Sequence, residues 1–533
     1  MERMPVTILV PMSRPLAVGA FALLLCGVST GAMAQAVGAA GHATPTGISQ
    51  EQLLALTARL DALEQRNSEL EAQILDLKGQ AASSDQAIRD QMNATTVSLN
   101  NGRPSFASGD GQFTAAFRGV FQLDAAKYDQ RSPGALATDF RRGSVGDAAE
   151  ADRARDLNDG ANFRRARIGV EGKAFGDWNY NFLYDFGGAG VEEAGKISSA
   201  WVEYAGFAPF SVRVGAFSPP SGIEEATSTN GSLFPERASP SEAVRGIASG
   251  DGRTAAGLFG NGERWNLSAV FSGNIIGTQT FDEQLAFVGR LAYVPHKTPD
   301  SVVHLGVDTV IVIDPAATGP NVAPGAATPL RLRDRPELRV DGMRLVDTGA
   351  IDAEGLTVLG AEFAAQYKAF SVQGEYYHID VKRRASALSN PDFHGWYVQG
   401  AWTLTGEPRR YSMATATFDS PRGEKPFSLK EGGKGVWELA ARYSDLDLDY
   451  LAGAAGTAPL ASAIRGGRQQ AYTFGLNWYP NAAVRFQADY QHVDIDRLSA
   501  GGATFGAGEL TPPAGAQIGQ TLSIWSLRTQ YAF

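Results

Sequence analysis

The sequence predicts an all-β fold, a 16-stranded antiparallel transmembrane β-barrel preceded by a short N-terminal α-helical coiled coil. Three observations lead to this prediction: apolar and polar residues alternate in many segments after residue 112, tight and long connections alternate between those segments, and a leucine heptad pattern precedes them. The mean hydropathy of -0.17 is compatible with a barrel, because each strand turns half of its residues away from lipid. After residue 34 no apolar run approaches the roughly 20 residues of a membrane-spanning helix, which excludes a helical bundle.

Residues 1–34 have the pattern of a secretory signal peptide. Arg3 and Arg14 precede or flank an apolar run over 16–28, and the small-residue site Ala32-Met33-Ala34 predicts cleavage after residue 34. The run is too short for a membrane anchor, and the leucine before Cys26 disfavours a lipoprotein site. Because Cys26 is the single cysteine, the mature chain is expected to contain no thiol.

Residues 49–80 carry a heptad pattern typical of a coiled coil, with Asn67 as the one polar residue of the seam. The pattern predicts an oligomerising segment, or alternatively an amphipathic helix that packs on its own chain. The number of copies stays open, because barrel pores often form trimers whereas a core Asn favours dimers. Small polar residues over 81–112 predict a linker. The seam residues are Leu53, Leu56, Leu60, Leu63, Asn67, Leu70, Ile74 and Leu77.

The barrel is expected to occupy residues 113–533. In its first strand, Phe117 and Phe121 share one face whereas Arg118 and Gln122 share the other, as in a strand between lipid and water. An even number of strands is expected when both ends of the barrel meet on the periplasmic side. The predicted strands are 113–128, 162–175, 178–186, 197–207, 210–217, 253–260, 264–274, 283–294, 301–313, 356–368, 370–382, 393–405, 434–447, 469–479, 483–496 and 520–533.

Tight and long connections alternate between these strands. Transmembrane barrels have short periplasmic turns and long outer loops, whereas a soluble β-sandwich has no reason to sort its loops in this way. The tight turns are predicted at Gly176-Asp177, Ala208-Pro209, Lys368-Ala369 and Pro480-Asn481, and the long loops at 129–161, 218–252, 314–355, 406–433 and 497–519.

The chain ends on Phe533, which shares a strand face with Trp525, Leu527, Thr529 and Tyr531. This resembles the C-terminal signature that outer-membrane barrels present to their assembly machinery. It predicts a bacterial outer-membrane protein that contacts lipid and lipopolysaccharide, with the coiled coil in the periplasm.

Several cationic side chains are predicted to face the lumen, because a charge on the lipid face near the midplane costs about 2–4 kcal/mol. Arg165, Arg167 and Lys173 lie opposite an apolar strand face, and Arg213 shares a face with two small residues. The lumen is therefore expected to be cationic, although each residue is alternatively a solvated or ion-paired lumen residue. The net charge of -10 and the scattered Lys and Arg residues exclude nucleic acid as a partner.

Five arginines lie between Arg331 and Arg344. In a loop folded into the pore, Arg331, Arg333 and Arg335 offer successive guanidinium groups that each bind an oxyanion in bidentate fashion. Several sites of moderate strength pass an ion onward. The alternative is an exposed basic loop that contacts lipopolysaccharide phosphates.

No pattern of catalysis or metal binding emerges from the sequence. The six histidines lack the spacing of a metal site, and no context unites Ser, His and Asp residues into a catalytic group. Neither an enzyme nor a cofactor is expected.

A series of motifs, in order along residues 113–533, resembles the phosphate-selective porin O and P family. The resemblance implies a trimeric sixteen-stranded barrel with an inward loop and an arginine ladder that conducts small inorganic anions, phosphate or polyphosphate. The motifs are Phe163-Arg164-Arg165-Ala166-Arg167, Asp177-Trp178-Asn179-Tyr180, Tyr184-Asp185, Val303-His304-Leu305-Gly306, Leu404-Thr405-Gly406-Glu407-Pro408-Arg409, Trp437-Glu438-Leu439, Arg442-Tyr443 and Gly475-Leu476-Asn477-Trp478-Tyr479.

By this resemblance, Arg164 and Arg165 match paired arginines of the constriction, and Arg331, Arg333, Arg335 and Arg344 match the arginine-rich loop. Two positions depart from the family's phosphate channels, which have arginine where this chain has Val120 and Ala216; Arg118 lies two residues before Val120 on the same face. The expected function is a passive outer-membrane channel that prefers anions such as phosphate. The alternatives are a general porin of little selectivity and an envelope tether or adhesin anchored by the barrel.

Overall fold

The computed structural model describes residues 49–100, 102–131, 157–187, 195–277, 283–316, 330–384, 386–501 and 514–533. The predicted signal peptide, residues 1–34, lies outside them. The chain separates into two units, Met1–Gln86 and Ala87–Phe533. None of the helices in the described ranges is long and apolar enough to cross a membrane.

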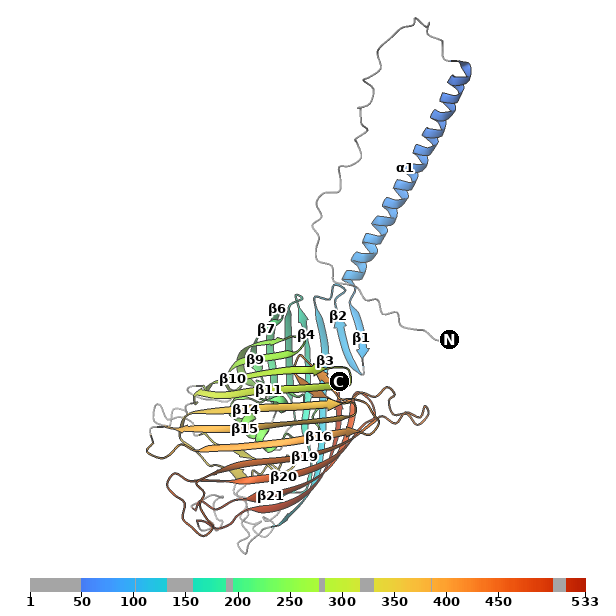
Figure 1. Cartoon of the computed structure of the whole chain (residues 1–533). Helices are drawn as coiled ribbons and strands as arrows, with labels where there is room; N and C mark the ends of the chain where they lie inside the picture. Colours follow the sequence, from blue (N-terminus) through green and yellow to red (C-terminus); the bar gives the residue numbers. More distant parts are fainter. Residues whose placement is uncertain are drawn as a thin grey trace. The chain divides into compact units, whose positions relative to one another are not determined.

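Sixteen antiparallel strands in the described part of the chain form a closed barrel, because the last strand pairs with the first as well as with its predecessor (Figure 1). Each predicted strand coincides with one observed strand, and the largest difference in a boundary is a start at Ile464 rather than at 469. The barrel strands are β3 (Thr114–Arg131), β4 (Gly160–Ala174), β5 (Trp178–Asp185), β6 (Lys196–Phe207), β7 (Phe210–Phe217), β8 (Arg253–Asn261), β9 (Trp265–Ile275), β10 (Leu285–Lys297), β11 (Ser301–Asp314), β14 (Ala353–Tyr367), β15 (Phe370–Arg383), β16 (Asp392–Thr403), β19 (Val436–Tyr450), β20 (Ile464–Tyr479), β21 (Val484–Asp496) and β22 (Gln520–Ala532).

The two faces of the strands have the predicted characters. In β5, Trp178 and Phe182 are 46% and 45% exposed, whereas Asn181 and Asp185 are buried at 4% and 3%. Because successive side chains of a strand point to opposite faces, the aromatic residues form the outer, lipid-facing surface and the polar residues line the interior.

Helix α1 (Gln50–Asn93) covers the predicted coiled-coil segment and continues through residues 81–93, where the sequence predicts a linker. The linker prediction is wrong here, because the run contains Ala, Gln, Ile, Arg and Met, which are favourable or tolerated in a helix. Its seam residues are exposed, with Leu56 at 66% and Leu77 at 63%.

Residues 96–107 form a β-hairpin, also within the predicted linker. Strand β1 (Thr96–Asn100) pairs with β2 (Arg103–Ala107), and β2 pairs with the start of β3. The overlooked signal is Asn101-Gly102 between two short alternating runs, since this dipeptide favours the two-residue turns of hairpins.

The connections sort between the two ends of the barrel as predicted, with one exception. The tight turns lie at one end, here called the turn end. Loop 218–252 and the described residues 330–352 of the connection between β11 and β14 lie at the other, the loop end. The sequence predicts 406–433 as an outer loop, which is wrong: residues 404–435 join β16 to β19 and therefore lie at the turn end, because antiparallel strands alternate in direction. Length alone does not determine the end at which a loop lies.

Three segments fold into the barrel. The first, here called the strap (residues 218–252), contains α2 (Ile223–Ala226) and α3 (Ser239–Ala248), and α3 contacts strands from β9 to β19. The second is the arginine-rich loop (residues 330–352), with β12 (Arg333–Asp334) and β13 (Val346–Asp347). The third is the turn-end loop (residues 404–435), with β17 (Arg410–Ser412) and β18 (Thr417–Asp419), where Arg290 of the wall donates to the Thr415 carbonyl at 2.7 Å. Together they narrow the lumen from both ends.

Candidate functional site

A β-bulge in β4 aims two consecutive arginines into the lumen. Gln122 of β3 pairs with Arg165, but the next residue, Leu123, pairs with Phe163, so Arg164 is an extra residue in its strand. In a regular strand, neighbouring side chains face opposite sides. The bulge allows both Arg164 and Arg165 to be buried inside, at 6% and 3% exposure.

Glu236 of the strap lies among four arginines. Its carboxylate oxygens lie 2.7 Å from Nε of Arg164, 3.1 Å from Nη2 of Arg528, 3.6 Å from Nε of Arg339 and 3.7 Å from Nη1 of Arg165. Burial by itself raises the pKa of Glu236, but the charges of these arginines, with Arg164 the strongest, hold it well below its usual range. Glu236 is therefore a permanent anion at this point of the lumen.

The ion pairs around Glu236 continue through the strap and the barrel wall. Glu242 pairs with Arg339 and Arg245, and Asp251 pairs with Arg245 and with Arg167 of β4. In the described part of the chain these ion pairs form two groups, which are together called the strap network and are together balanced in charge. The group joined to Glu236 has a small cationic excess, and the second group, with the opposite excess, is Arg442 with Glu224 and Glu337. The group joined to Glu236 contains the seven arginines Arg164, Arg165, Arg167, Arg237, Arg245, Arg339 and Arg528 and the six acidic residues Asp124, Asp185, Glu225, Glu236, Glu242 and Asp251.

The arginine-rich loop is buried in its middle and open towards its ends. Arg331 donates from Nε to Asp347 at 2.7 Å, and its side chain is 47% exposed. Arg335 is 4% exposed and donates to the carbonyl of Gly342 at 2.8 Å, and Glu337 pairs with Arg442 of β19 at 2.5 Å. The loop thus enters the barrel as the sequence predicts.

Two further arginines of this loop, Arg333 and Arg344, are less buried, the first exposed and the second half-buried. The loop therefore does not present four equivalent guanidinium groups.

The loop also contains a buried aspartate. Burial and the charge of Glu242 raise the pKa of Asp334 to about 7.

A cleft at the turn end of the barrel carries the excess of positive charge. Its volume is about 600 Å³. Arg118, one of the residues predicted from the sequence, lies there with Arg103, and both pair with Glu171, at 2.9 and 2.5 Å. The lining contains six cationic side chains, Arg103, Arg118, Arg410, Arg422, Lys425 and Arg485, against the two acidic side chains Glu171 and Asp419.

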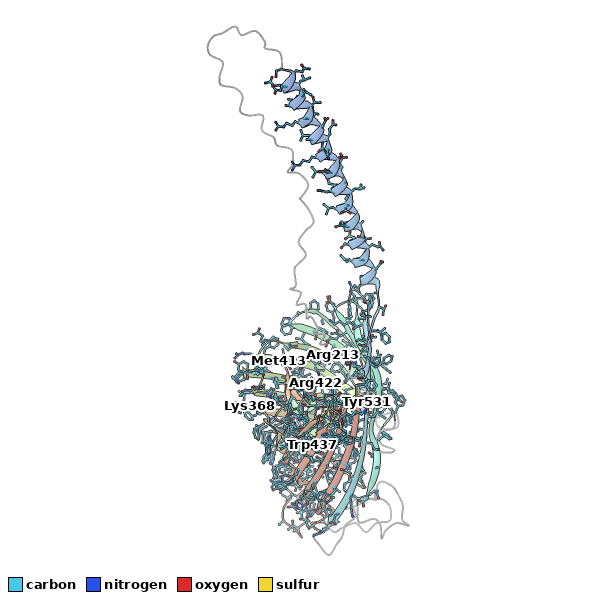
Figure 2. All side chains as sticks on the ribbon, turned by 90° about the vertical axis from the view of Figure 1, so that its right-hand side faces the viewer. Arg213, Lys368, Met413, Arg422, Trp437 and Tyr531 are labelled. Atoms are coloured by element: carbon cyan, nitrogen blue, oxygen red, sulfur yellow. The ribbon has the colours of Figure 1, made fainter. Side chains whose placement is uncertain are left out.

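Arg422 (Figure 2) and Lys425 of the turn-end loop are exposed, and the described part of the chain offers neither of them an ion-pair partner. Unpaired cations beside a water-filled passage attract anions from solution more strongly than neutralised ones. This cleft is therefore the part of the lumen best suited to binding an anion.

The remaining predicted residues lie elsewhere. Arg213 (Figure 2) is inside the barrel, where it pairs with Glu203 at 2.7 Å and lies 4.2 Å from the ring centre of Trp201. Lys173 is exposed near the end of β4. Val120 and Ala216, the two departures from the family pattern, are both buried at 3% exposure. These residues do not form one site with the strap network.

Arg528 and Glu236 are central to the network, yet neither is among the residues predicted from the sequence. Arg528 alternates with the outward-facing Leu527 and Thr529, which does signal an inward side chain. Its partner Asp124, however, is 404 residues away along the chain, and no local pattern shows that pairing. Arg422 and Lys425 are not among the predicted residues either, because neither an arginine run nor a strand alternation marks them in the sequence.

A closed barrel with an apolar outer surface and a polar interior defines the class of transmembrane β-barrel proteins of outer membranes. The chain belongs to the phosphate-selective porin O and P family, whose model matches residues 139–501. It is a porin of the bacterial outer membrane, and the family and fold indicate a channel rather than an enzyme.

Two curated relatives are similar to most of the chain. Porin O of Pseudomonas aeruginosa is 29% identical over 410 residues, which cover 72% of this chain and 91% of that protein. An uncharacterized protein of Caulobacter vibrioides is 27% identical over 417 residues, covering 75% of this chain and 72% of that protein. Among solved structures, the anion-selective porin from Comamonas acidovorans is 13% identical, with a TM-score of 0.42 over 79% of this chain and 100% of that one.

Proposed function

We propose that the protein is a passive channel that prefers anions, with phosphate and related oxyanions such as polyphosphate as its solutes. The observation that carries this proposal is the turn-end cleft, where six cationic side chains face two acidic ones. Family membership agrees with it. No catalytic step is needed, because diffusion down a gradient requires only binding sites of moderate strength.

The strap network supports the same proposal in a different way. Each guanidinium group that faces Glu236 already has a carboxylate partner. A passing oxyanion therefore competes with that carboxylate for the guanidinium group and does not bind an uncompensated positive charge. Partial neutralisation keeps the anion from binding too tightly to leave. Val120 and Ala216 remove two cations that the family's phosphate channels have, which favours weaker binding here.

Single-channel recording tests the anion preference. In planar bilayers under a KCl gradient, the double variant Arg422→Ala/Lys425→Ala is expected to lose several-fold in its anion-to-cation permeability ratio, because it removes the two unpaired cations of the cleft. The matched control is Lys368→Ala, an exposed lysine at the turn end outside the cleft (Figure 2). An unchanged reversal potential in the double variant contradicts the assignment of the cleft.

The same recordings separate an oxyanion channel from a general porin. Added phosphate is expected to block chloride current, and replacement of Arg331, Arg333 and Arg335 by Ala is expected to weaken the block. Absence of any block identifies a general porin built on the same barrel.

We further propose that the protein is a homotrimer and that α1 forms a coiled coil between its copies. The support is the exposed apolar seam, which a second helix would cover. Deletion of residues 49–80 is expected to leave conductance intact while lowering the temperature at which the oligomer dissociates on a gel. Loss of conductance, or an unchanged dissociation temperature, contradicts this role of the helix.

The terminal Phe533 is proposed as the signal read by the outer-membrane assembly machinery, residues 1–34 as a removed signal peptide, and lipopolysaccharide as a surface partner. In the folded barrel Phe533 exchanges two backbone hydrogen bonds with Gly119, at 3.0 and 3.1 Å. The terminal residue therefore also helps to join the last strand to the first.

A further inference from the structure

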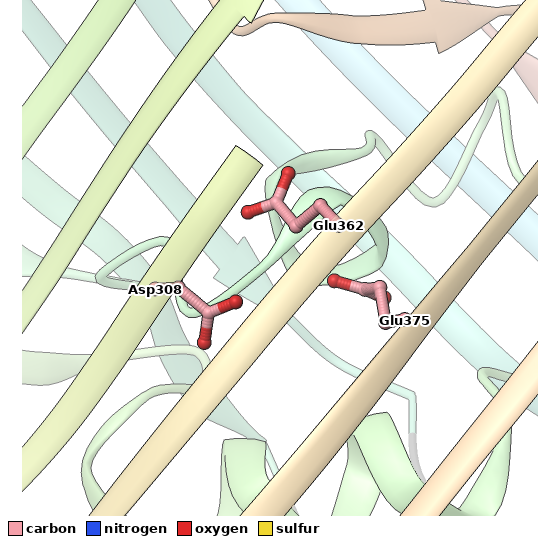
Figure 3. Close-up of side chains that lie close together, drawn as sticks. All are labelled: Asp308, Glu362 and Glu375. Carbon is pink, nitrogen blue, oxygen red and sulfur yellow. The ribbon is translucent and has the colours of Figure 1, made fainter. Parts of the chain in front are cut away.

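Three carboxylates come together on the inner wall of the barrel, beside the strap and without an ion pair to its network in the described part of the chain. Asp308 of β11, Glu362 of β14 and Glu375 of β15 each place an oxygen within 4.8 Å of the others, and all three are buried (Figure 3). In Figure 3 the three side chains lie close together, and the carboxylates of Asp308 and Glu375 face each other. Like charges at this separation repel strongly unless something compensates them.

Two of these carboxylates have partners. Glu362 accepts two hydrogen bonds of 2.8 Å from Arg290 and lies 3.0 Å from Nε2 of His304. Glu375 accepts from the backbone N–H of Ile223 in the strap at 2.6 Å and from the Tyr397 hydroxyl at 2.7 Å. Both carboxylates are therefore held in fixed positions, one by the wall and one by the strap.

Asp308 is different. It is 5% exposed, and neither of its carboxylate oxygens has a hydrogen-bond partner among the described residues. Arg290 lies directly opposite Asp308 in the strand register, yet its guanidinium group is directed to Glu362. Burying a carboxylate that has no hydrogen-bond partner costs free energy. A cation bound by the lone pairs of the Asp308 oxygens would offset this cost.

The backbone leaves room for this carboxylate. Gly360 pairs with Asp308, and a side-chain carbon at 360 would come within 2.3 Å of Oδ2 of Asp308. The aspartate side chain therefore lies over a glycine and points towards Glu362 and Glu375.

We propose that Asp308, Glu362 and Glu375 bind a divalent cation of the Ca²⁺ type. Three carboxylates and Arg290 leave a local charge of -2 when all are ionised, which one divalent ion neutralises. The three oxygens lie within 4.8 Å of one another, so small movements of the side chains bring them around one ion. Ca²⁺ takes 6–8 oxygen ligands at about 2.3–2.6 Å in flexible geometry, whereas Mg²⁺ demands near-octahedral ligands at about 2.0–2.1 Å and usually keeps several waters, so a cluster of three protein carboxylates favours Ca²⁺.

A cation at this place joins three parts of the molecule. Asp308 and Glu362 belong to the wall, Glu375 is hydrogen-bonded to the strap, and His304 beside Glu362 contacts the Tyr411 hydroxyl of the turn-end loop at 2.7 Å. The ion would fix the strap against the wall. The site does not depend on the anion preference proposed above.

Calorimetric titration of the full-length barrel tests this proposal. The protein is refolded in detergent without lipopolysaccharide, because lipopolysaccharide itself binds divalent cations, and it is treated with EDTA before titration with CaCl₂. One Ca²⁺ per chain is expected, with Mg²⁺ binding at least about tenfold more weakly. Asp308→Asn is expected to raise the Kd for Ca²⁺ by at least about tenfold, since it removes one ligand charge.

The chain offers a matched control in Asp489. This residue is also buried at 3% exposure, has no hydrogen-bond partner for either oxygen in the described ranges, and lies over a glycine, Gly475. Its nearest charges are arginines, with Arg485 the strongest, so Asp489→Asn is expected to leave Ca²⁺ binding unchanged.

Gly360→Ala provides a second variant, because it displaces the Asp308 carboxylate without changing any charge; it too is expected to weaken Ca²⁺ binding. Three results overturn the proposal: no Ca²⁺ binding up to millimolar concentration, equal affinity in Asp308→Asn and the parent, or tighter binding of Mg²⁺ than of Ca²⁺. Circular dichroism and the gel shift of the unheated barrel confirm that each variant is folded.

Discussion

Replacement of Glu236 by Gln is expected to destabilise the barrel and, at the same time, to create an anion-binding site. Four arginines lie within 3.7 Å of this carboxylate, so its loss leaves their charges facing one another. Removing one partner of a buried ion pair typically costs about 3–5 kcal/mol. Phosphate, which accepts from guanidinium groups in the same bidentate geometry, is expected to restore much of this loss.

The measurement is denaturant unfolding of the refolded barrel, with and without phosphate. The free energy of unfolding of Glu236→Gln is expected to rise with phosphate concentration, because a ligand that binds only the folded state stabilises it. Glu203→Gln is the control, since Glu203 pairs with the single, partly exposed Arg213. If phosphate stabilises both variants equally, the four arginines do not form an anion site in the absence of Glu236.

The strand pattern could be predicted from the sequence because it depends on local chemistry. Each strand must present an apolar face to lipid, so residues such as Trp178 and Phe182 recur at every second position regardless of their neighbours in space. The bulge at Arg164 could not be predicted in this way. It depends on the register between β3 and β4, which joins residues that are distant along the chain.

The pairing of charges in the lumen could not be predicted from the sequence either. The sequence predicts inward-facing arginines, but their partners come from the strap, from the arginine-rich loop and from neighbouring strands that are distant along the chain. A count of arginines near Arg331 therefore predicts a bare cationic ladder, whereas the folded chain pairs Arg331 with Asp347 of the same loop and Arg339 with two glutamates of the strap. The fold decides which charges remain uncompensated.

Replacement of Arg528 by Leu is expected to be the most destabilising single change in the wall. Arg528 is 1% exposed and donates to both oxygens of Asp124, at 2.5 and 2.6 Å, directly across the seam where β22 meets β3. It also contacts Glu236 at 3.1 Å, so one side chain joins the barrel closure to the strap. Its loss leaves Asp124, itself 1% exposed, as a buried charge without its partner, at a cost of about 3–5 kcal/mol.

The double variant Asp124→Leu/Arg528→Leu separates this explanation from a simple loss of packing. When both charges are removed together, no carboxylate is left unpaired at the seam, and replacing a buried ion pair by apolar residues is often neutral or stabilising. Denaturant unfolding is therefore expected to show the double variant as more stable than Arg528→Leu alone. If the double variant is the less stable of the two, the ion pair contributes more than its desolvation costs, and the closure of the barrel depends on the attraction between these two charges.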